Sequence, residues 1–420
     1  MTATATATAR RLLEDIFASK RVKCAISLTG GGGNVAGEIL GTSGASSTLL
    51  ELTVPYYQQS LVDFLNLPSE VVNREVPTRF SYSSQEVSML MAKKSLERAR
   101  VLVSLDEAAA CVGIGCTAAL VSLQPRRGSH RAFVTLCSVH GTYNFSLDLH
   151  KGARSRKEED ECVGNLIVLA LSKAANVDVS QLQKDLTPHE LDTLTVDATE
   201  FDNAMSSTLL SLHSTSIAFF PNNVVLRDMP WKRMLVLPGS FNPVHQGHME
   251  FARASQRLLE KLDGGELYTP LFELSIKNAD KGALVDVADL TRRVQGLVET
   301  HHQRVVLTNA SLFVDKAALF PACVFAIGAD TAVRLVDPKY YGHDVNNVWM
   351  ALSTIASHKC RFVVAGRLVG GTFVTAEESV SKVPSPFQHL FLPLPESDFR
   401  LDLSSTEIRE RLNGGTALPS

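Results

Sequence analysis

The sequence lacks long apolar runs and paired cysteines. Its apolar stretches are far shorter than the roughly 20 residues that a membrane-spanning helix needs, so no membrane contact is expected. The seven cysteines form no CxxC pair and no regular spacing, which predicts reduced thiols in an intracellular compartment. An apolar leader segment is also lacking at the N-terminus, so the cytoplasm is the expected location.

An excess of charge of one sign is missing as well. The 41 Lys and Arg residues face 44 Asp and Glu residues, for a net charge of −3. This balance gives no electrostatic reason to expect a nucleic-acid partner. A chain of 420 residues is too long for one ordinary core, which predicts two domains. The oligomeric state stays open, and a homo-oligomer is compatible with the sequence.

Strand and helix patterns alternate in both halves of the chain, which indicates two α/β domains. The boundaries expected are a low-complexity Ala/Thr tail over 1–10, a first domain over 11–180, a linker over 181–230 and a second domain over 231–420. In the first domain we expect helices over 12–18, 83–100 and 158–174, and strands over 23–28, 109–120 and 131–136. The linker is expected to carry a helix at 187–194. Strands of the second domain are expected over 233–237, 304–307, 324–327, 361–364 and 389–392.

The most informative motif is LPGSFNPVHQGH over 237–248. It ends a predicted strand, makes a Gly-rich turn and opens a helix. A helix N-terminus carries free N–H groups and a partial positive charge, so a phosphate can bind there. His245 and His248 lie on one side of the first turn, with Gly247 between them. The motif therefore predicts a phosphoryl-binding site.

A second motif, SSTEIR over 404–409, places three hydroxyls at a predicted helix start and an arginine one turn later. Hydroxyls, backbone N–H groups and a guanidinium suit the β- and γ-phosphates of a nucleoside triphosphate. Each motif has an alternative interpretation. The two histidines could cap a helix at the surface or bind a metal, although no third ligand is close in sequence. The hydroxyls could form a plain helix cap.

Together the two motifs resemble the HxGH nucleotidyltransferase superfamily, and within it the nicotinamide and nicotinate mononucleotide adenylyltransferases. The likeness covers about residues 234–413, and NADKG (278–282) and IGAD (327–330) resemble further segments of that group. It implies a Rossmann-like doubly wound parallel sheet. It also implies a nucleotide-binding set, which comprises Gly239, Ser240, Phe241, Gly328, Asp330, Ser404, Ser405, Thr406 and Arg409.

The resemblance further implies the chemistry. A phosphate oxygen of the acceptor attacks the α-phosphorus of ATP and pyrophosphate leaves, so catalysis relies on positioning and charge stabilisation. With a mononucleotide acceptor the product is NAD or deamido-NAD. His245 and His248 are expected at the α-phosphate, and Lys281 near the acceptor or the polyphosphate. Mg²⁺ is expected to accompany ATP with few protein ligands, and no resident metal is expected.

The first half contains AISLTGGGG over 25–33, a strand followed by a loop rich in backbone donors. Such a loop can cradle an anion, or its glycines can simply permit a tight turn. With SLTGG at 27–31, the half resembles the C-terminal domain of the CinA family, known for nicotinamide mononucleotide deamidase activity. VPY (54–56), GIG (113–115, at the family's Gly-Ile-Ala turn) and GAR (152–154) extend the likeness over about residues 11–174. The pocket that it implies contains Ser27, Thr29, Gly30, Gly31, Tyr56 and Arg154.

The CinA likeness leaves the catalytic status of the first half open. The family's lysine falls here on Ser60 or Leu61, so the group that could activate Ser27 is missing. Deamidation and a non-catalytic pocket both stay possible interpretations.

Three functions are compatible with the whole sequence. The first is an adenylyltransferase that acts on nicotinamide or nicotinate mononucleotide. The second is a nucleotidyltransferase with another phosphorylated acceptor, of the phosphopantetheine or cytidylyl type, because segments 272–280 and 330–341 differ from the usual mononucleotide-binding sequences. The third is a nucleotide-binding regulatory or protein-quality-control factor with little turnover.

Overall fold

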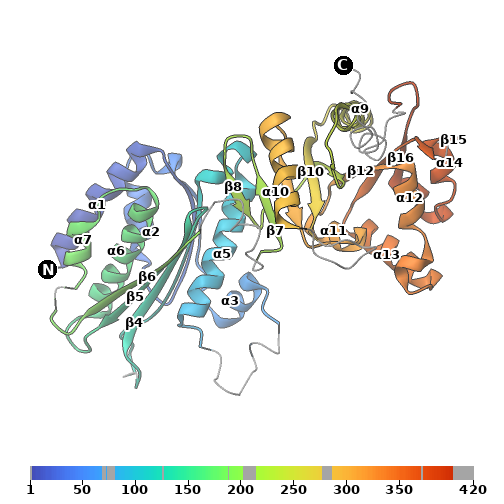
Figure 1. Cartoon of the computed structure of the whole chain (residues 1–420). Coiled ribbons are helices and arrows are strands. Elements are labelled where there is room, and N and C mark those ends of the chain that lie inside the picture. The colour runs from blue at the N-terminus through green and yellow to red at the C-terminus, as the bar shows by residue number, and fades with distance from the viewer. Residues whose placement is uncertain are drawn as a thin grey trace. The chain divides into compact units, whose positions relative to one another are not determined.

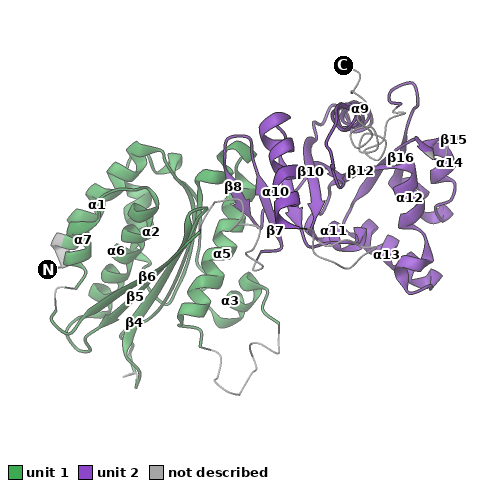
Figure 2. Cartoon of the chain, in the orientation of Figure 1, with its two compact units in different colours: residues 1–202 green, residues 203–420 purple. Residues whose placement is uncertain are grey.

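The computed structural model describes residues 2–68, 72, 81–124, 127–187, 189–201, 214–276, 286–369 and 372–400. The chain divides into two compact units, residues 1–202 and residues 203–420 (Figure 2). Each unit contains a sheet with helices packed on it (Figure 1). The two α/β domains predicted from the sequence are therefore confirmed.

The first unit contains a mixed sheet of six strands in the order β2-β1-β3-β4-β5-β6. Strands β2, β1 and β3 run parallel, and the later pairs are antiparallel. The strands are β1 (Lys23–Thr29), β2 (Leu49–Thr53), β3 (Cys111–Ala119), β4 (His130–Cys137), β5 (Gly141–Leu149) and β6 (Thr193–Glu200). The helices are α1 (Thr2–Ser19), α2 (Asn34–Gly41), α3 (Gln58–Leu65), α5 (Gln85–Leu102), α6 (Arg156–Ala174) and α7 (Ser180–Asp185), with 3₁₀ turns η1 (Ala45–Ser47) and η2 (Leu105–Ala110). Figure 1 shows α1, α2 and α6 on one face of this sheet and α5 on the other.

The second unit contains an eight-stranded sheet in the order β16-β13-β12-β9-β10-β11-β7-β8. Six strands are parallel, and β7 and β8 add an antiparallel edge. The strands are β7 (Ser216–Phe219), β8 (Val225–Arg227), β9 (Met234–Pro238), β10 (Thr269–Ser275), β11 (Val305–Thr308), β12 (Val324–Gly328), β13 (Arg361–Ala365) and β16 (Phe391–Leu394), with a hairpin of β14 (Arg367–Val369) and β15 (Thr372–Val374). The helices are α9 (Gln246–Leu262), α10 (Val287–Gln295), α11 (Phe313–Leu319), α12 (Ala329–Leu335), α13 (Val345–Ser357) and α14 (Ala376–Val380), with short turns η3 (Gly296–Thr300), η4 (Pro338–Tyr341) and η5 (Ser385–Leu390). This arrangement confirms the Rossmann-like sheet.

The N-terminal helix differs from the prediction. We expected a helix over 12–18 after a low-complexity tail, but α1 begins at Thr2. Ala5 and Ala9, spaced one turn apart, are buried in the same core as α6. Small side chains on one face let a helix pack closely, so the Ala/Thr repeat forms part of the domain.

The predicted linker over 181–230 is wrong in most of its length. Strand β6 (Thr193–Glu200) pairs with β5 at the edge of the first sheet, and β7 and β8 belong to the second sheet. The helix expected at 187–194 is absent from the described residues there, and α7 ends at Asp185. Most of β6 is exposed, and an exposed edge strand is rich in the Thr and Asp residues that resemble a linker.

The GIG segment, placed at a turn by the CinA likeness, lies inside strand β3. Helix α5 packs directly against it. A Cβ atom built on Gly115 would lie 2.2 Å from the carbonyl oxygen of Ser88 in α5. The glycines there serve the close approach of helix and strand.

Candidate active site

The site in the second unit lies where the strand order reverses. Strand β9 pairs with β10 on one side and with β12 on the other. In open parallel sheets, the crevice at the carboxyl ends of such strands is the usual ligand site. The GSFNP loop follows β9 and leads into the N-terminus of α9, so the sequence motif occupies this position.

Packing of Phe241 shapes the loop after β9. The Phe241 ring is buried and contacts the rings of His248 and Phe272 edge to face, at centroid distances of 5.0 and 5.3 Å. A Cβ atom on Gly239 would lie 2.8 Å from the Phe241 ring. Gly239 is therefore required for this ring to fold back under the loop.

His245 and His248 face each other at the start of α9. Their rings are stacked with centroids 3.8 Å apart, and the backbone N–H of His245 donates to Nδ1 of His248 at 3.1 Å. Because Nδ1 accepts this hydrogen bond, the neutral ring of His248 carries its proton on Nε2. The structure thus orients His248 as an N–H donor.

Both histidines are biased toward the neutral form. Burial, together with the neighbouring His245 ring, lowers the pKa of His248 to about 3. Burial, assisted by the Arg367 guanidinium, also lowers the pKa of His245. A negative phosphate beside the pair would favour the protonated forms, so the pair is suited to an anion.

The histidines line a cavity of about 430 Å³ together with Gly239, Ser240, Phe241, Gly328 and Asp330. The structure therefore brings these predicted residues together. Arg367 also lines this cavity, and its Nη1 donates to both carboxylate oxygens of Asp330 at 3.1 Å. Lys281, Ser404, Ser405, Thr406 and Arg409 lie outside the described residues, so their placement stays a prediction.

A second cavity of about 330 Å³ adjoins the first. The two share Pro238, Gly239, Ser240, Thr331 and Arg334 as lining residues. Sequence reasoning missed its chemical groups, which include Arg293 and a buried ion pair of Glu273 and Lys316. A glutamate inside an apolar strand segment (LFELS) was the one local signal for that pair.

Arg293 supports the GSFNP loop from α10. Its Nη1 donates to the carbonyl oxygen of Ser240 at 3.2 Å, and its Nη2 is paired with Asp289 one turn earlier. The loop therefore packs on the Phe241 ring and also accepts a hydrogen bond from the Arg293 guanidinium.

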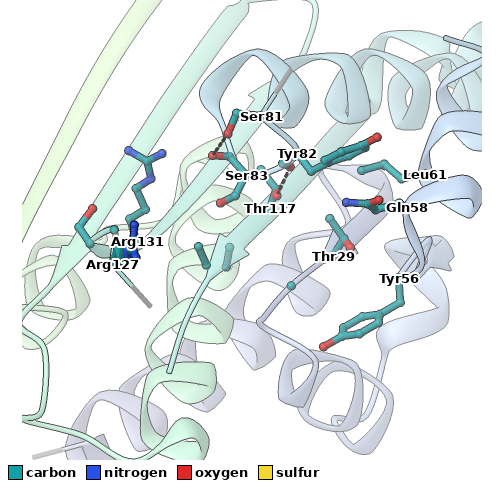
Figure 3. A pocket seen from close by; sticks show the side chains of 15 residues that line it. Thr29, Tyr56, Gln58, Leu61, Ser81, Tyr82, Ser83, Thr117, Arg127 and Arg131 are labelled. Atoms are coloured by element: carbon teal, nitrogen blue, oxygen red, sulfur yellow. Dashed lines mark hydrogen bonds between the residues drawn. The ribbon is translucent and has the colours of Figure 1, made fainter. Parts of the chain in front are cut away.

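The first unit has a larger pocket of about 760 Å³. Thr29, Gly30 and Tyr56 line it, as the CinA likeness implied. Figure 3 shows Arg127 and Arg131 on one side, Tyr56 and Gln58 on the other, and Thr29 and Thr117 between them. Thr29 and Thr117 are neighbours in the β1–β3 ladder.

Three predicted residues do not line this pocket. Ser27 is fully buried, with its hydroxyl donating to the carbonyl oxygen of Met91 at 3.3 Å and accepting from Ser95 at 2.9 Å. Gly31 packs against Leu120, which a Cβ atom would approach to 2.7 Å. Arg154 forms a buried ion pair with Asp192. Ser27 and Thr29 are two residues apart and lie on the same face of β1, but Ser27 is covered by α5, with Met91 and Ser95 at its hydroxyl, whereas Thr29 at the end of the strand lines the pocket.

The glycine loop that we expected to bind an anionic ligand already binds a carboxylate of the same chain. The Asp160 carboxylate accepts the backbone N–H groups of Gly32 at 2.8 Å, Gly33 at 3.4 Å and Asn34 at 3.1 Å. An internal carboxylate thus occupies the N-terminus of α2, where we expected a ligand.

Two further observations limit the kinds of site. Among the described residues, no helix combines the length and apolar character needed to cross a bilayer. Within the same ranges, no group of three or more His, Cys, Asp or Glu side chains is placed to hold a metal ion.

Comparison with known proteins defines the class of the second unit. Residues 236–411 match the family described as Cytidylyltransferase-like. The C-terminal half is therefore a nucleotidyltransferase-like domain, and the predicted resemblance to nucleotidyltransferases is confirmed. A curated relative, the "Probable nicotinate-nucleotide adenylyltransferase" of Gloeobacter violaceus, is 29% identical over 200 residues, which are 44% of this chain and 86% of the relative.

Solved structures of CinA-type proteins are also similar to this chain. A competence-damaged protein (CinA) superfamily protein from Escherichia coli has 16% sequence identity and a TM-score of 0.30, covering 40% of this chain and 86% of that one. The competence/damage inducible protein CihA from Agrobacterium tumefaciens has 17% identity and a TM-score of 0.31, covering 40% of this chain and 95% of that one.

Proposed function

We propose that the protein transfers AMP from ATP, bound with Mg²⁺, to nicotinamide or nicotinate mononucleotide. The products are NAD or deamido-NAD and pyrophosphate. The observation that carries this proposal is the pair of stacked histidines at a helix N-terminus, within a nucleotidyltransferase-like domain. The name of the Gloeobacter relative supports the choice of acceptor.

The proposed chemistry uses the groups that line the cavity. A phosphate oxygen of the mononucleotide forms a bond to the α-phosphorus of ATP, the bond from the α-phosphorus to the bridging oxygen breaks, and pyrophosphate leaves with the electron pair. His248 donates its Nε2–H to an α-phosphate oxygen, where charge develops in the transition state. The N-terminus of α9 and the guanidinium of Arg334 at the rim add positive potential.

A pyrophosphate-release assay tests this function. Full-length protein is supplied with ATP and Mg²⁺ and with each mononucleotide separately, and His248→Ala is the control. We expect release that depends on the mononucleotide and falls about 100-fold or more in the variant, as for the loss of one oxyanion donor. Protein that makes neither NAD nor deamido-NAD would rule out the proposal.

The nucleotide is a separate question, because the matching family is named for cytidylyl transfer. Replacing ATP by CTP in the same assay separates an adenylyl from a cytidylyl donor preference. If CTP is the better donor, a different phosphorylated acceptor, such as a phosphopantetheine or a cytidylyl acceptor, becomes the correct interpretation. If ATP binds equally well to wild type and His248→Ala and neither gives product, a regulatory role is favoured.

For the first unit we propose a pocket that binds a phosphorylated ligand without hydrolysing it. The supporting observation is the burial of Ser27, whose hydroxyl is engaged by Met91 and Ser95. Incubation with nicotinamide mononucleotide should therefore release no ammonia, while calorimetry detects binding that Arg131→Ala weakens and Ser27→Ala does not. Ammonia release that Ser27→Ala abolishes would show instead that the unit is a deamidase.

A further inference from the structure

The second cavity of the nucleotidyltransferase-like unit is the place where an acceptor would extend away from the reacting phosphate. It shares Ser240 and Arg334 with the histidine cavity, so the acceptor's phosphate belongs at this common rim. Beyond the rim the lining turns apolar, with Leu290, Leu312 and Phe313. An apolar cavity with a few polar groups is the usual form of a site for a flat organic ring.

Two of the polar side chains that line this second cavity, Glu273 and Lys316, form an ion pair. Oε1 of Glu273 on β10 accepts from Nζ of Lys316 on α11 at 2.6 Å and from the hydroxyl of Thr308 at 2.5 Å. Nζ of Lys316 also donates to the carbonyl oxygen of Ala310 at 2.9 Å. Only 1% of the Glu273 side chain and 6% of the Lys316 side chain is exposed. Buried ion pairs contribute little net stability, so stability alone does not account for this pair.

The pair has one donor and one acceptor left for a ligand. A lysine ammonium has three protons, and the hydrogen bonds to Glu273 and Ala310 use two of them. Within the described part of the chain, both donors to Glu273 contact Oε1, so Oε2 can accept another hydrogen bond. Both residues line the cavity. The cavity lining thus offers a hydrogen-bond acceptor, Oε2 of Glu273, beside a donor, Nζ of Lys316.

A primary carboxamide has the complementary arrangement. Its NH₂ group donates and its carbonyl oxygen accepts, so it can bind Glu273 and Lys316 at once. A carboxylate has two acceptors and no donor, and one of its oxygens would face the Glu273 carboxylate. Like charges at this distance disfavour binding in a buried site.

The other cations of this cavity are engaged elsewhere. Arg293 is bound through Nη2 to Asp289 and through Nη1 to the Ser240 carbonyl, and its Nε is buried without a partner among the described residues. Arg334 donates to the hydroxyl of Tyr340 at 3.1 Å and lies at the rim that the phosphate would occupy. Neither is placed by these contacts to compensate a carboxylate next to Glu273.

We propose that Glu273 and Lys316 determine acceptor specificity, and that they select a pyridine mononucleotide bearing a carboxamide over one bearing a carboxylate. This rests on the proposed adenylyl transfer to a pyridine mononucleotide. It assigns to this chain a preference for the nicotinamide form, whereas the relative from Gloeobacter is named for the nicotinate form.

The test compares kcat/KM for nicotinamide and nicotinate mononucleotide with full-length protein. Wild type should prefer the amide about tenfold or more, because hydrogen-bonding groups left unpaired in a site reject the wrong analogue strongly. Glu273→Gln presents an N–H donor where Oε2 was, and should move the preference toward nicotinate about tenfold or more. The double variant Glu273→Leu with Lys316→Met replaces the pair by apolar side chains, a change that buried ion pairs often tolerate, and should bring the ratio near one.

A matched control is an ion pair of the same unit that lines neither cavity. Asp263 at the end of α9 pairs with Arg361 at the start of β13. Asp263→Asn should lower thermal stability and leave the amide-to-acid ratio unchanged. A wild type that prefers nicotinate, or a double variant that keeps the wild-type ratio, would overturn the proposal.

A failure of the proposed function is distinguishable from a failure of this inference. If neither mononucleotide is adenylylated, calorimetric binding of each mononucleotide without ATP decides the inference separately. About tenfold tighter binding of the amide form, lost in the double variant, supports it. Equal affinities, or binding of neither, overturn it.

Discussion

At the scale of single residues, the hydrogen bonds that a side chain makes decide its role more than its residue type does. His248 and Ser27 are both motif residues, but they are used in opposite ways. The backbone N–H of His245 fixes the tautomer of His248, which lines the cavity and keeps its proton on Nε2. The hydroxyl of Ser27 is engaged by Met91 and Ser95 inside the first core. The neutral state of His248 has a consequence for stability.

We expect the second unit to become less stable as the pH is lowered, because of His248. Its pKa is about 3 in the folded protein against an ordinary value of 6.5. Below pH 6.5 the unfolded chain binds a proton that the folded chain does not, so the free energy of unfolding decreases as the pH falls from 6.5 toward 3. In His248→Gln this contribution is absent, and glutamine at this position preserves the helix-capping arrangement.

Urea denaturation at pH 7.5 and 5.5 measures the effect. The loss of stability between the two pH values should be smaller in His248→Gln than in wild type by on the order of 1 kcal/mol. Equal losses in both proteins would show that the folded pKa of His248 is not depressed.

At the scale of elements, composition alone misidentified two segments. The Ala/Thr repeat at the N-terminus forms the first turns of α1, and the Thr/Asp-rich stretch near 193–200 forms the edge strand β6. Both have weak apolar signals, because one packs through alanines and the other is mostly exposed. Their structure depends on the neighbouring α6 and β5.

Helix α1 offers a test with a built-in control. Ala9 is buried against the core, whereas Ala7 on the same helix is exposed. Ala9→Glu should destabilise the first unit by about 2–4 kcal/mol, since a carboxylate would enter an apolar interface. Ala7→Glu should change stability by less than about 0.5 kcal/mol. Chemical denaturation followed by circular dichroism compares them, and equal effects would mean that α1 does not pack as described.

At the scale of the whole molecule, the two units have separate hydrophobic cores. One core is built from residues between Ala5 and Leu186, the other from residues between Ile217 and Leu394. Each also has its own cavities, and the histidine cavity lies entirely in the second unit. Separate cores predict separate unfolding transitions.

Scanning calorimetry of the full chain should therefore show two transitions. ATP with Mg²⁺ at about 100 times its dissociation constant should raise one of them by about 5–10 °C, because the proposed nucleotide site lies in the second unit. Ala9→Glu should lower the other transition and leave the ATP-sensitive one in place. A single transition that ATP shifts as a whole would contradict the independence of the cores.

Much of this protein could be predicted from local sequence patterns. Strands β1, β9, β12 and β13 and helices α5 and α6 were expected within a few residues of their bounds, and α9 begins inside the motif that was expected to open a helix, because buried strands and amphipathic helices have short apolar periods. The spacing of His245 and His248 likewise determines that both rings lie at one helix start. Local spacing was enough to find the end of the second unit where the histidine cavity lies.

Contacts between distant residues were decided by the tertiary structure alone. Asp160 fills the glycine loop 126 to 128 residues away, Arg154 pairs with Asp192 across 38 residues, and Lys316 reaches Glu273 across 43. Such pairs leave no periodic signal, since each depends on how strands and helices are ordered in the sheet. The sequence by itself determined most of the elements and the histidine motif, and the packing of those elements decided which polar groups line a cavity and which are paired inside the protein.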